Sequence, residues 1–243
     1  MRYSNKVNIY ISDTNAKGVL SLINTANIIQ NSSNRLFKKI GIDQITMNNK
    51  FGYVWVVTRT KIQVYDEIPW DKTVEVESYI TSKTSVRMVV DTAFKNKEGS
   101  ILIYAKVETC LFDLNENKIK RITDDLFEKP FEILQPEKPF NYEGFDSNLK
   151  YTLCDEITVR SNNIDFCCHT NNVEYIRFIM GAYPVEEIIK TEFTDFEIKY
   201  LSQTYEKDKL KILKNTNDGV DNFIIINNDT EIVKCRIKTK KNI

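Results

Sequence analysis

Two stretches of the chain repeat one succession of apolar and polar positions: a short apolar segment, a polar loop, a helical pattern and several alternating segments. In the first stretch, residues 7–11 are expected to form a strand and residues 13–18 a turn-rich loop. A helix is expected between Ser21, a favourable N-cap residue, and Gly41, a favourable residue just past a helix end. Between them apolar residues recur mostly at steps of three and four, which is the spacing of one helix face.

After residue 52 the apolar period falls to two. Strands are expected at residues 53–67, 74–80, 86–94 and 101–111. This alternation is typical of antiparallel strands with one buried face. Residues 96–99 form a turn between two of them. The stretch 123–148 holds three of the five prolines and shows little periodicity, so we interpret it as a linker.

The same order then returns. A strand is expected at residues 151–160, a polar loop at 165–172 and a helix at 173–182. Pro184 is expected to start a short second helix, because its missing N–H is unused in a first turn. Further strands are expected at residues 193–204, 209–213, 222–226 and 231–238. The two loops can be overlaid so that Asp13, Asn15 and Lys17 fall on Asp165, Cys167 and His169.

The repeated pattern predicts an α+β tandem double hotdog, in which each half is a long central helix wrapped by a curved antiparallel sheet. The expected units are an N-terminal hotdog at residues 1–121, a linker at 122–149 and a C-terminal hotdog at 150–243. The alternative is an unrelated α+β domain with strands before and after its helices.

The composition indicates a globular protein and argues against two classes of binding protein. Of the 243 residues 42% are apolar, which predicts a packed core, and 34 basic residues balance 34 acidic ones. Neither general nucleic-acid binding nor membrane-surface binding is therefore indicated. The first residues lack the apolar stretch of a secretion signal, so a cytoplasmic location is expected. Five scattered cysteines then read as reduced thiols.

The loop at 165–172 carries the candidate chemistry. In an extended segment Asp165, Cys167, His169 and Asn171 share one side, so they could face a cleft together. The helix that follows has unpaired N–H groups and partial positive charge at its start, which would polarise a thioester carbonyl. Aspartate or histidine could then activate a water or orient the substrate. This chemistry requires neither a metal nor a cofactor.

Other interpretations of the same residues remain open. Asn171 or Asn172 could serve only as the helix cap, and Asp165 could bond only loop amides. A lone histidine is often structural. The run Cys167-Cys168-His169 could bind a metal, although a second ligand pair is not evident. Cys167 beside His169 could form a nucleophilic dyad, although such a cysteine more often serves in packing.

The segment Asp165-x-x-x-His169-x-Asn171-Asn172-Val173-x-Tyr175 resembles the C-terminal hotdog of acyl-acyl-carrier-protein thioesterases. The resemblance extends to further motifs: Asp13-Thr-Asn15-Ala-x-Gly18-x-Leu20, Trp55-Val-Val-x-Arg59, Trp70-x-x-Thr73-Val74 and Phe196-Glu197-Ile198-x-Tyr200-Leu201. It implies an enzyme that releases a free fatty acid from an acyl chain on the phosphopantetheine of acyl carrier protein, acting as a monomer or a homodimer. Basic candidates for contact with that acidic carrier are Lys38, Lys39, Lys118, Lys120 and Arg121.

The family's Asp-x-Asn-x-His motif falls on Asp165, Cys167 and His169, so the asparagine is replaced by Cys167. The Glu-Cys pair of the plant members aligns with Leu201-Ser202, where Ser202 at best replaces the polarity of the cysteine. In the first half Lys17 is expected at the place of the histidine, so that half is expected to shape the acyl pocket. An acyl-coenzyme A thioesterase and a catalytically weak acyl-binding protein are the alternatives.

Overall fold

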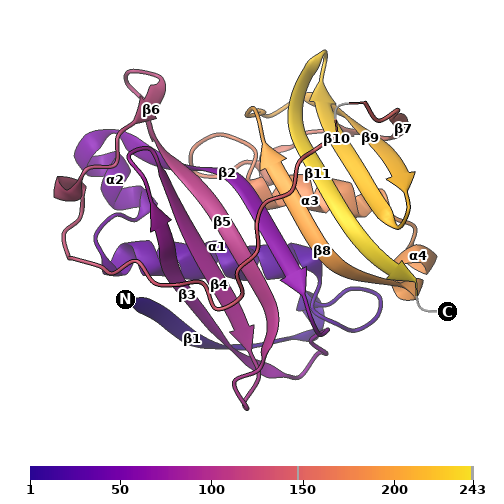
Figure 1. The fold of residues 1–243 in the computed structure, drawn as a ribbon. Helices are drawn as coiled ribbons and strands as arrows, with labels where there is room; N and C mark the ends of the chain where they lie inside the picture. Colours follow the sequence, from indigo (N-terminus) through magenta and orange to yellow (C-terminus); the bar gives the residue numbers. More distant parts are fainter. Residues whose placement is uncertain (147, 242–243) are drawn as a thin grey trace.

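The computed structural model describes residues 1–146 and 148–241, and its strands form one 11-stranded antiparallel sheet (Figure 1). Ser147 of the expected linker and residues 242–243 of the expected C-terminal unit lie outside the described residues. The strands are β1 (Arg2–Asn8), β2 (Tyr53–Val64), β3 (Thr73–Lys83), β4 (Arg87–Lys95), β5 (Ile101–Asp113), β6 (Lys118–Lys120), β7 (Thr152–Thr158), β8 (Thr191–Tyr200), β9 (Lys209–Asn217), β10 (Val220–Asn227) and β11 (Thr230–Lys241).

The strand order is symmetric about the centre of the sheet. It runs β1-β3-β4-β5-β2 and then β8-β11-β10-β9-β7, with β6 attached to β5. Outward from the centre, the first half runs β2-β5-β4-β3-β1 and the second runs β8-β11-β10-β9-β7. Each strand of the first half therefore has a counterpart at the same place in the second half. The halves join where β2 pairs with β8, with Lys61 opposite Glu197. The repeat seen in the sequence is thus a structural repeat.

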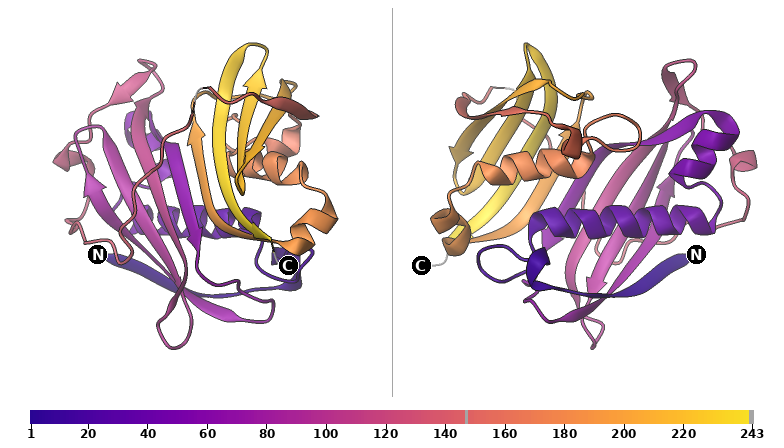
Figure 2. Two further views of the ribbon diagram at one scale, coloured as in Figure 1. Left: turned by 45° about the vertical axis from the view of Figure 1, so that its right-hand side comes forward. Right: turned by 180° about the vertical axis from the view of Figure 1, so that it is seen from behind.

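Helices of both halves cover the same face of the sheet (Figure 2). They are α1 (Leu22–Lys39), α2 (Gln44–Phe51), α3 (Asn172–Gly181) and α4 (Val185–Lys190). Ser21 caps α1 by accepting from the Asn24 amide, and Gly41 takes a positive φ of 77° just past the helix. Ile29 of α1 and Ile176 of α3 pack into the same apolar core. In the described part of the chain, no helix has the length and apolarity needed to cross a bilayer.

Two expectations about elements were wrong in detail, and one helix was not expected. The first strand is the half-exposed segment Arg2–Asn8, not residues 7–11, because an edge strand buries only alternate side chains. The helix expected at residues 173–182 is confirmed as α3, one residue earlier, although its 10 residues make it much shorter than the 18-residue α1. Pro184 is the N-cap of α4 and not its first helical residue. Residues 44–51, for which no helix was expected, form α2.

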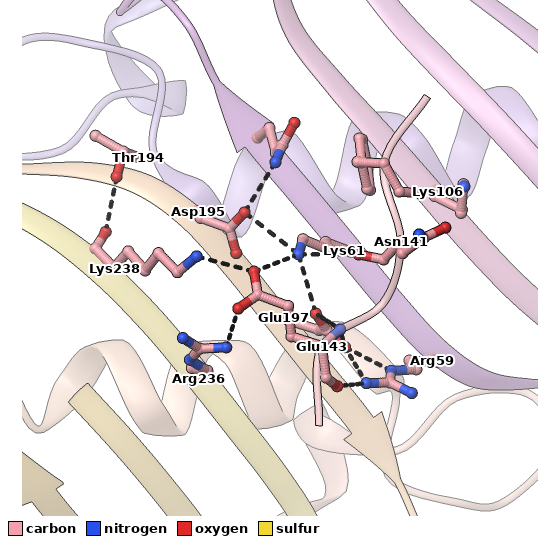
Figure 3. A network of polar contacts seen from close by, with 12 residues as sticks. Arg59, Lys61, Lys106, Asn141, Glu143, Thr194, Asp195, Glu197, Arg236 and Lys238 are labelled. Carbon is pink, nitrogen blue, oxygen red and sulfur yellow. Dashed lines mark hydrogen bonds and ion pairs between the residues drawn. The ribbon is translucent and has the colours of Figure 1, made fainter. Parts of the chain in front are cut away.

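The linker starts beside the helices, where the Glu128 amide donates to the Ile40 carbonyl just past α1, and then crosses the face of the sheet opposite the helices (Figure 1). Where it crosses the junction of β2 and β8, it meets a buried network of charges (Figure 3). The Lys61 ammonium is buried and lies 2.8 Å from Glu143 of the linker, 3.3 Å from Glu197 and 3.5 Å from Asp195. Arg59 bonds Glu197 through Nε at 2.6 Å.

The network joins three parts of the chain. Glu143 also pairs with Arg236 and, at 2.9 Å, with Lys238, both on β11. Burial raises the pKa of this carboxyl, but hydrogen bonds from Lys61 and Lys238 and the surrounding cations lower it to about 2. The linker is therefore a packed element that fastens the two halves together.

Candidate active site at the junction of two cavities

The loop between β7 and α3 is shaped by a tight turn and not by an extended segment. The Asp165 Oδ1 accepts from the Cys167 amide at 2.8 Å, and the Asp165 carbonyl accepts from the Cys168 amide at 3.0 Å. Cys168 adopts a positive φ of 64°, which is uncommon for a residue with a side chain. The alternating geometry expected from the sequence is therefore wrong, although three of the residues it selected, Asp165, Cys167 and His169, line one cavity.

The corresponding loop of the first half shows the true register of the repeat. There the Asn15 Oδ1 accepts from the Lys17 amide at 2.9 Å, and the Asn15 carbonyl accepts from the Gly18 amide at 2.9 Å. The amides of Asn15 and Asp165 donate to the carbonyls of Val19 and His169, respectively. Asn15 thus corresponds to Asp165.

The overlay expected from the sequence is consequently wrong by two residues. Lys17 corresponds to Cys167, and Val19, not Lys17, occupies the place of His169. The overlay failed because it was anchored on Asp13. That aspartate accepts from the Tyr10 amide at 2.9 Å, as Asn163 accepts from the Arg160 amide at 2.8 Å.

Most of the predicted site residues line one cavity of about 370 Å³. Asp165, Cys167, His169 and Ser202 contribute to its wall. Asn171 does not join them, because its side chain caps α3 by accepting from the Val173 amide at 3.0 Å. The structure therefore gives Asn171 the capping position that was the alternative interpretation.

Buried hydroxyls hold the loop beside the cavity. Thr170 Oγ1 lies 2.7 Å from Thr204 Oγ1, and the Tyr175 hydroxyl lies 2.8 Å from the same atom. The His169 ring packs edge-on against Tyr205, with 5.1 Å between the ring centroids. No hydrogen bond within residues 1–146 and 148–241 uses the His169 imidazole, so both ring nitrogens can serve a bound substrate or water.

A second cavity of about 700 Å³ adjoins the first. Residues of α1 and the first-half sheet form much of its wall, including Ile29, Val57, Val90 and Val107. The two cavities share the following lining residues: Gln44, Trp55, Val57, Asp165, Asn172 and Tyr200. Asp165 and the start of α3 therefore lie at the junction between the two cavities.

The Cys167 thiol is partly buried in the wall of the smaller cavity. Burial raises its pKa, and the charge of Asp165 adds to the effect, although a hydrogen bond from Gln44 opposes it. A thiol whose pKa is raised carries little thiolate at neutral pH, and thiolate is the nucleophilic form. Among the described residues, no three His, Cys, Asp or Glu side chains are placed so that they could hold a metal ion.

Sequence reasoning missed the contribution of α2. Gln44 begins α2, where Asp43 is the N-cap and accepts from the Thr46 amide at 3.2 Å. The Gln44 Nε2 lies 3.5 Å from the Cys167 Sγ, although 123 residues separate Gln44 from Cys167 in the chain. The Asp43 cap and Gly52 could have indicated the helix, but no local signal indicates the contact.

At the place in the first half that corresponds to Cys167, a charged side chain fills the loop. The Lys17 ammonium pairs with Glu67 and also donates to the Thr191 carbonyl at 3.3 Å. Its side chain is only 12% exposed. This mirrored position therefore carries an ion pair where the second half carries a thiol and a cavity.

Comparison with known proteins places the chain in a family. Family models of the acyl-ACP thioesterase N-terminal domain and C-terminal domain match residues 1–129 and 147–242. The chain is 24% identical over 171 residues to oleoyl-acyl carrier protein thioesterase 2, chloroplastic, of Arabidopsis thaliana, covering 65% of this chain and 45% of that protein. It is 24% identical over 221 residues to the dodecanoyl-[acyl-carrier-protein] hydrolase, chloroplastic, of Cinnamomum camphora, covering 82% and 55%. The chain thus spans about half the length of these curated relatives.

Solved structures agree on the fold. An acyl-ACP thioesterase from Bacteroides thetaiotaomicron superposes with a TM-score of 0.85 at 18% identity, covering 98% of both chains. The 12:0-ACP thioesterase from Umbellularia californica superposes with a TM-score of 0.82 at 20% identity, covering 99% of this chain and 98% of that one. The fold is therefore of the hotdog type found in these enzymes, and the chain belongs to the acyl-ACP thioesterase family.

Proposed function

We propose that this protein hydrolyses an acyl thioester on the phosphopantetheine of acyl carrier protein and releases a free fatty acid. The observation that carries the proposal is the meeting of Asp165, His169 and the start of α3 beside the junction of two cavities. A thioester at this junction can place its acyl chain in one cavity and its carrier arm in the other. Family membership supports the same reaction.

The fold supports a division of labour between two hotdogs. We take residues 1–121 as the first hotdog, 122–149 as the linker and 150–243 as the second, which together form a tandem double hotdog. Apolar side chains of α1, β2, β4 and β5 line the larger cavity, so the first hotdog supplies most of the acyl pocket. The loop of the second supplies the reacting groups.

The reaction needs a base, an oxyanion site and an acid. Asp165 and His169 are the bases that line the smaller cavity, and one of them takes a proton as water attacks the carbonyl carbon. The backbone N–H of Asn172 lies at the start of α3, where N–H groups lack helical partners and the helix dipole favours negative charge. The developing oxyanion is stabilised there. The carbon–sulfur bond then breaks, and the sulfur receives the proton.

Acyl carrier protein is expected to be the preferred carrier. Acyl chains of graded length should be released from acyl carrier protein with a kcat/KM about tenfold above that for the same chains on coenzyme A. The advantage should shrink as salt is added, because physiological ionic strength screens charges beyond roughly 8 Å. Release assays on both carriers between low and high salt measure this. Equal efficiency on coenzyme A at low salt would favour an acyl-coenzyme A thioesterase, and tight acyl binding without turnover would favour an acyl-binding protein.

Among the basic residues expected to contact the carrier, Lys38 is the one we favour. Lys38 lines the larger cavity together with Arg35. Lys118 and Lys120 lie on β6 instead, where both pair with Glu116 of the preceding turn. Lys38→Ala should therefore raise KM for the acyl carrier protein substrate and reduce its salt dependence. Lys118→Ala is the matched control and should change neither.

Cys167 is not expected to act as the nucleophile. Cys167→Asn should keep or raise activity, because an amide at this position can orient substrate without forming an acyl intermediate. Cys167→Ser should lower activity only modestly. Mass spectrometry of enzyme quenched during turnover tests the proposal. An acyl adduct on Cys167, together with an inactive Cys167→Asn variant, would establish covalent catalysis instead.

A further inference from the structure

Gln44 brings an amide from the first half into the site formed by the second half. It is the first residue of α2 and lines both cavities, together with Asp165 and Asn172. A hydrogen bond from a neighbouring side chain fixes the surroundings of the Gln44 side chain. Trp55 donates from its indole Nε1 to the Ile42 carbonyl at 2.7 Å, which fastens the start of α2 to β2.

The orientation of the Gln44 amide follows from its neighbours. Its Oε1 accepts from the Trp55 backbone N–H at 2.8 Å. Because that N–H can only donate, the oxygen must face the strand, and the NH₂ group must point away from it. Nε2 accordingly lies 3.5 Å from the Cys167 Sγ, at the junction of the cavities.

The NH₂ group has no strong acceptor in the described part of the chain. A neutral thiol is a weak acceptor, and the amide carries two N–H donors. At least one donor is therefore available to a group with more negative charge. Asn172 lines the same two cavities and contributes a backbone N–H at the start of α3, and no hydrogen bond among the described residues uses this N–H.

We propose that Gln44 is a catalytic residue that donates a hydrogen bond from Nε2 to the thioester oxygen, in concert with the Asn172 N–H. This inference rests on the proposed thioester hydrolysis and adds a donor to it. The oxyanion is then held by one donor from each half of the chain. Neither half by itself contains the complete site.

The test compares Gln44→Glu and Gln44→Met with the wild-type enzyme in acyl carrier protein release assays. Gln44→Glu keeps the acceptor for the Trp55 N–H and removes both donors, so it separates catalysis from folding. Because loss of one oxyanion donor lowers kcat by about 10²–10³-fold, both variants should lose about 10²-fold in kcat with KM within about twofold. Asn49→Asp, an amide-to-carboxylate change on the exposed side of α2, is the matched control and should retain wild-type kcat.

A rescue experiment distinguishes donation from packing. Since Nε2 lies 3.5 Å from the Cys167 Sγ, an asparagine at 167 can place an amide near the same point. Gln44→Met/Cys167→Asn should therefore recover at least about tenfold in kcat over Gln44→Met. Folded variants with wild-type kcat, or with only KM raised, would overturn the role of Gln44. Absence of wild-type turnover on every acyl carrier protein and coenzyme A substrate would instead overturn the proposed function.

Discussion

Asp165→Asn and His169→Ala are each expected to lower kcat by about 10²–10⁴-fold, the range that general acid–base catalysis contributes. Both residues line the smaller cavity, and Asp165 also lines the larger one, so both can reach a thioester at the junction. Asp165→Asn removes the charge and keeps the oxygen that accepts from the Cys167 amide. The measurement is single-turnover release of the acyl chain, with circular dichroism to confirm folding.

The first half of the molecule provides the control for this experiment. Asn15 occupies the place of Asp165 and accepts from the Lys17 amide in the same turn, so asparagine is compatible with the loop. The reciprocal change Asn15→Asp should therefore leave kcat unchanged. Near-normal turnover by a folded Asp165→Asn or His169→Ala protein would remove that residue from the mechanism.

Lys61→Met is expected to destabilise the fold by about 3–5 kcal/mol, because removal of one partner leaves buried charges uncompensated. Lys61 is 1% exposed, and Glu197, also 1% exposed, loses one of its two cations. For a chain of this size each kcal/mol shifts Tm by about 2–4 °C, so thermal unfolding should show a drop of roughly 6–20 °C. Lys118→Met, which breaks a pair whose lysine side chain is 62% exposed, should leave Tm unchanged.

Acid provides a second measure of the same network. The pKa of Glu143 is lowered to about 2 from an ordinary value of 4.5, so its contribution to stability is complete above pH 4.5 and is lost as pH falls towards 2. Lys61 supplies part of that shift, so Lys61→Met should lose less stability over this range than the wild-type protein. A variant with wild-type Tm and an unchanged acid transition would show that the network contributes little to folding.

Much of the fold could be predicted from periodicity, because buried sheet faces and helix stripes leave a direct record in the order of apolar residues. The strands from β2 to β5 and the cap at Ser21 were predictable for this reason. Helix α2 was not, because Met47 is the one buried residue among its eight and no apolar stripe is present. The linker was expected to be a plain connection, yet Glu143 lies within the charge network at the junction of the halves.

The candidate site was predictable where its residues are neighbours in sequence. Asp165, Cys167 and His169 lie within one loop, so a motif could indicate them. Gln44 could not be predicted in this way, because its contact with Cys167 depends on the pairing of two halves. The overlay of the two loops was also wrong, because it matched the aspartates Asp13 and Asp165. The backbone hydrogen bonds of the two turns show instead that Asn15 corresponds to Asp165.

The Lys17–Glu67 pair has a consequence for how a chain with two related loops can change over generations. In a homodimer one gene encodes both loops, so every mutation appears in both subunits and the two loops stay identical. In this chain the two loops are inherited as separate stretches of one gene. An ion-paired lysine can therefore stand in one loop while aspartate and histidine stay in the other, and each loop can change without altering its counterpart.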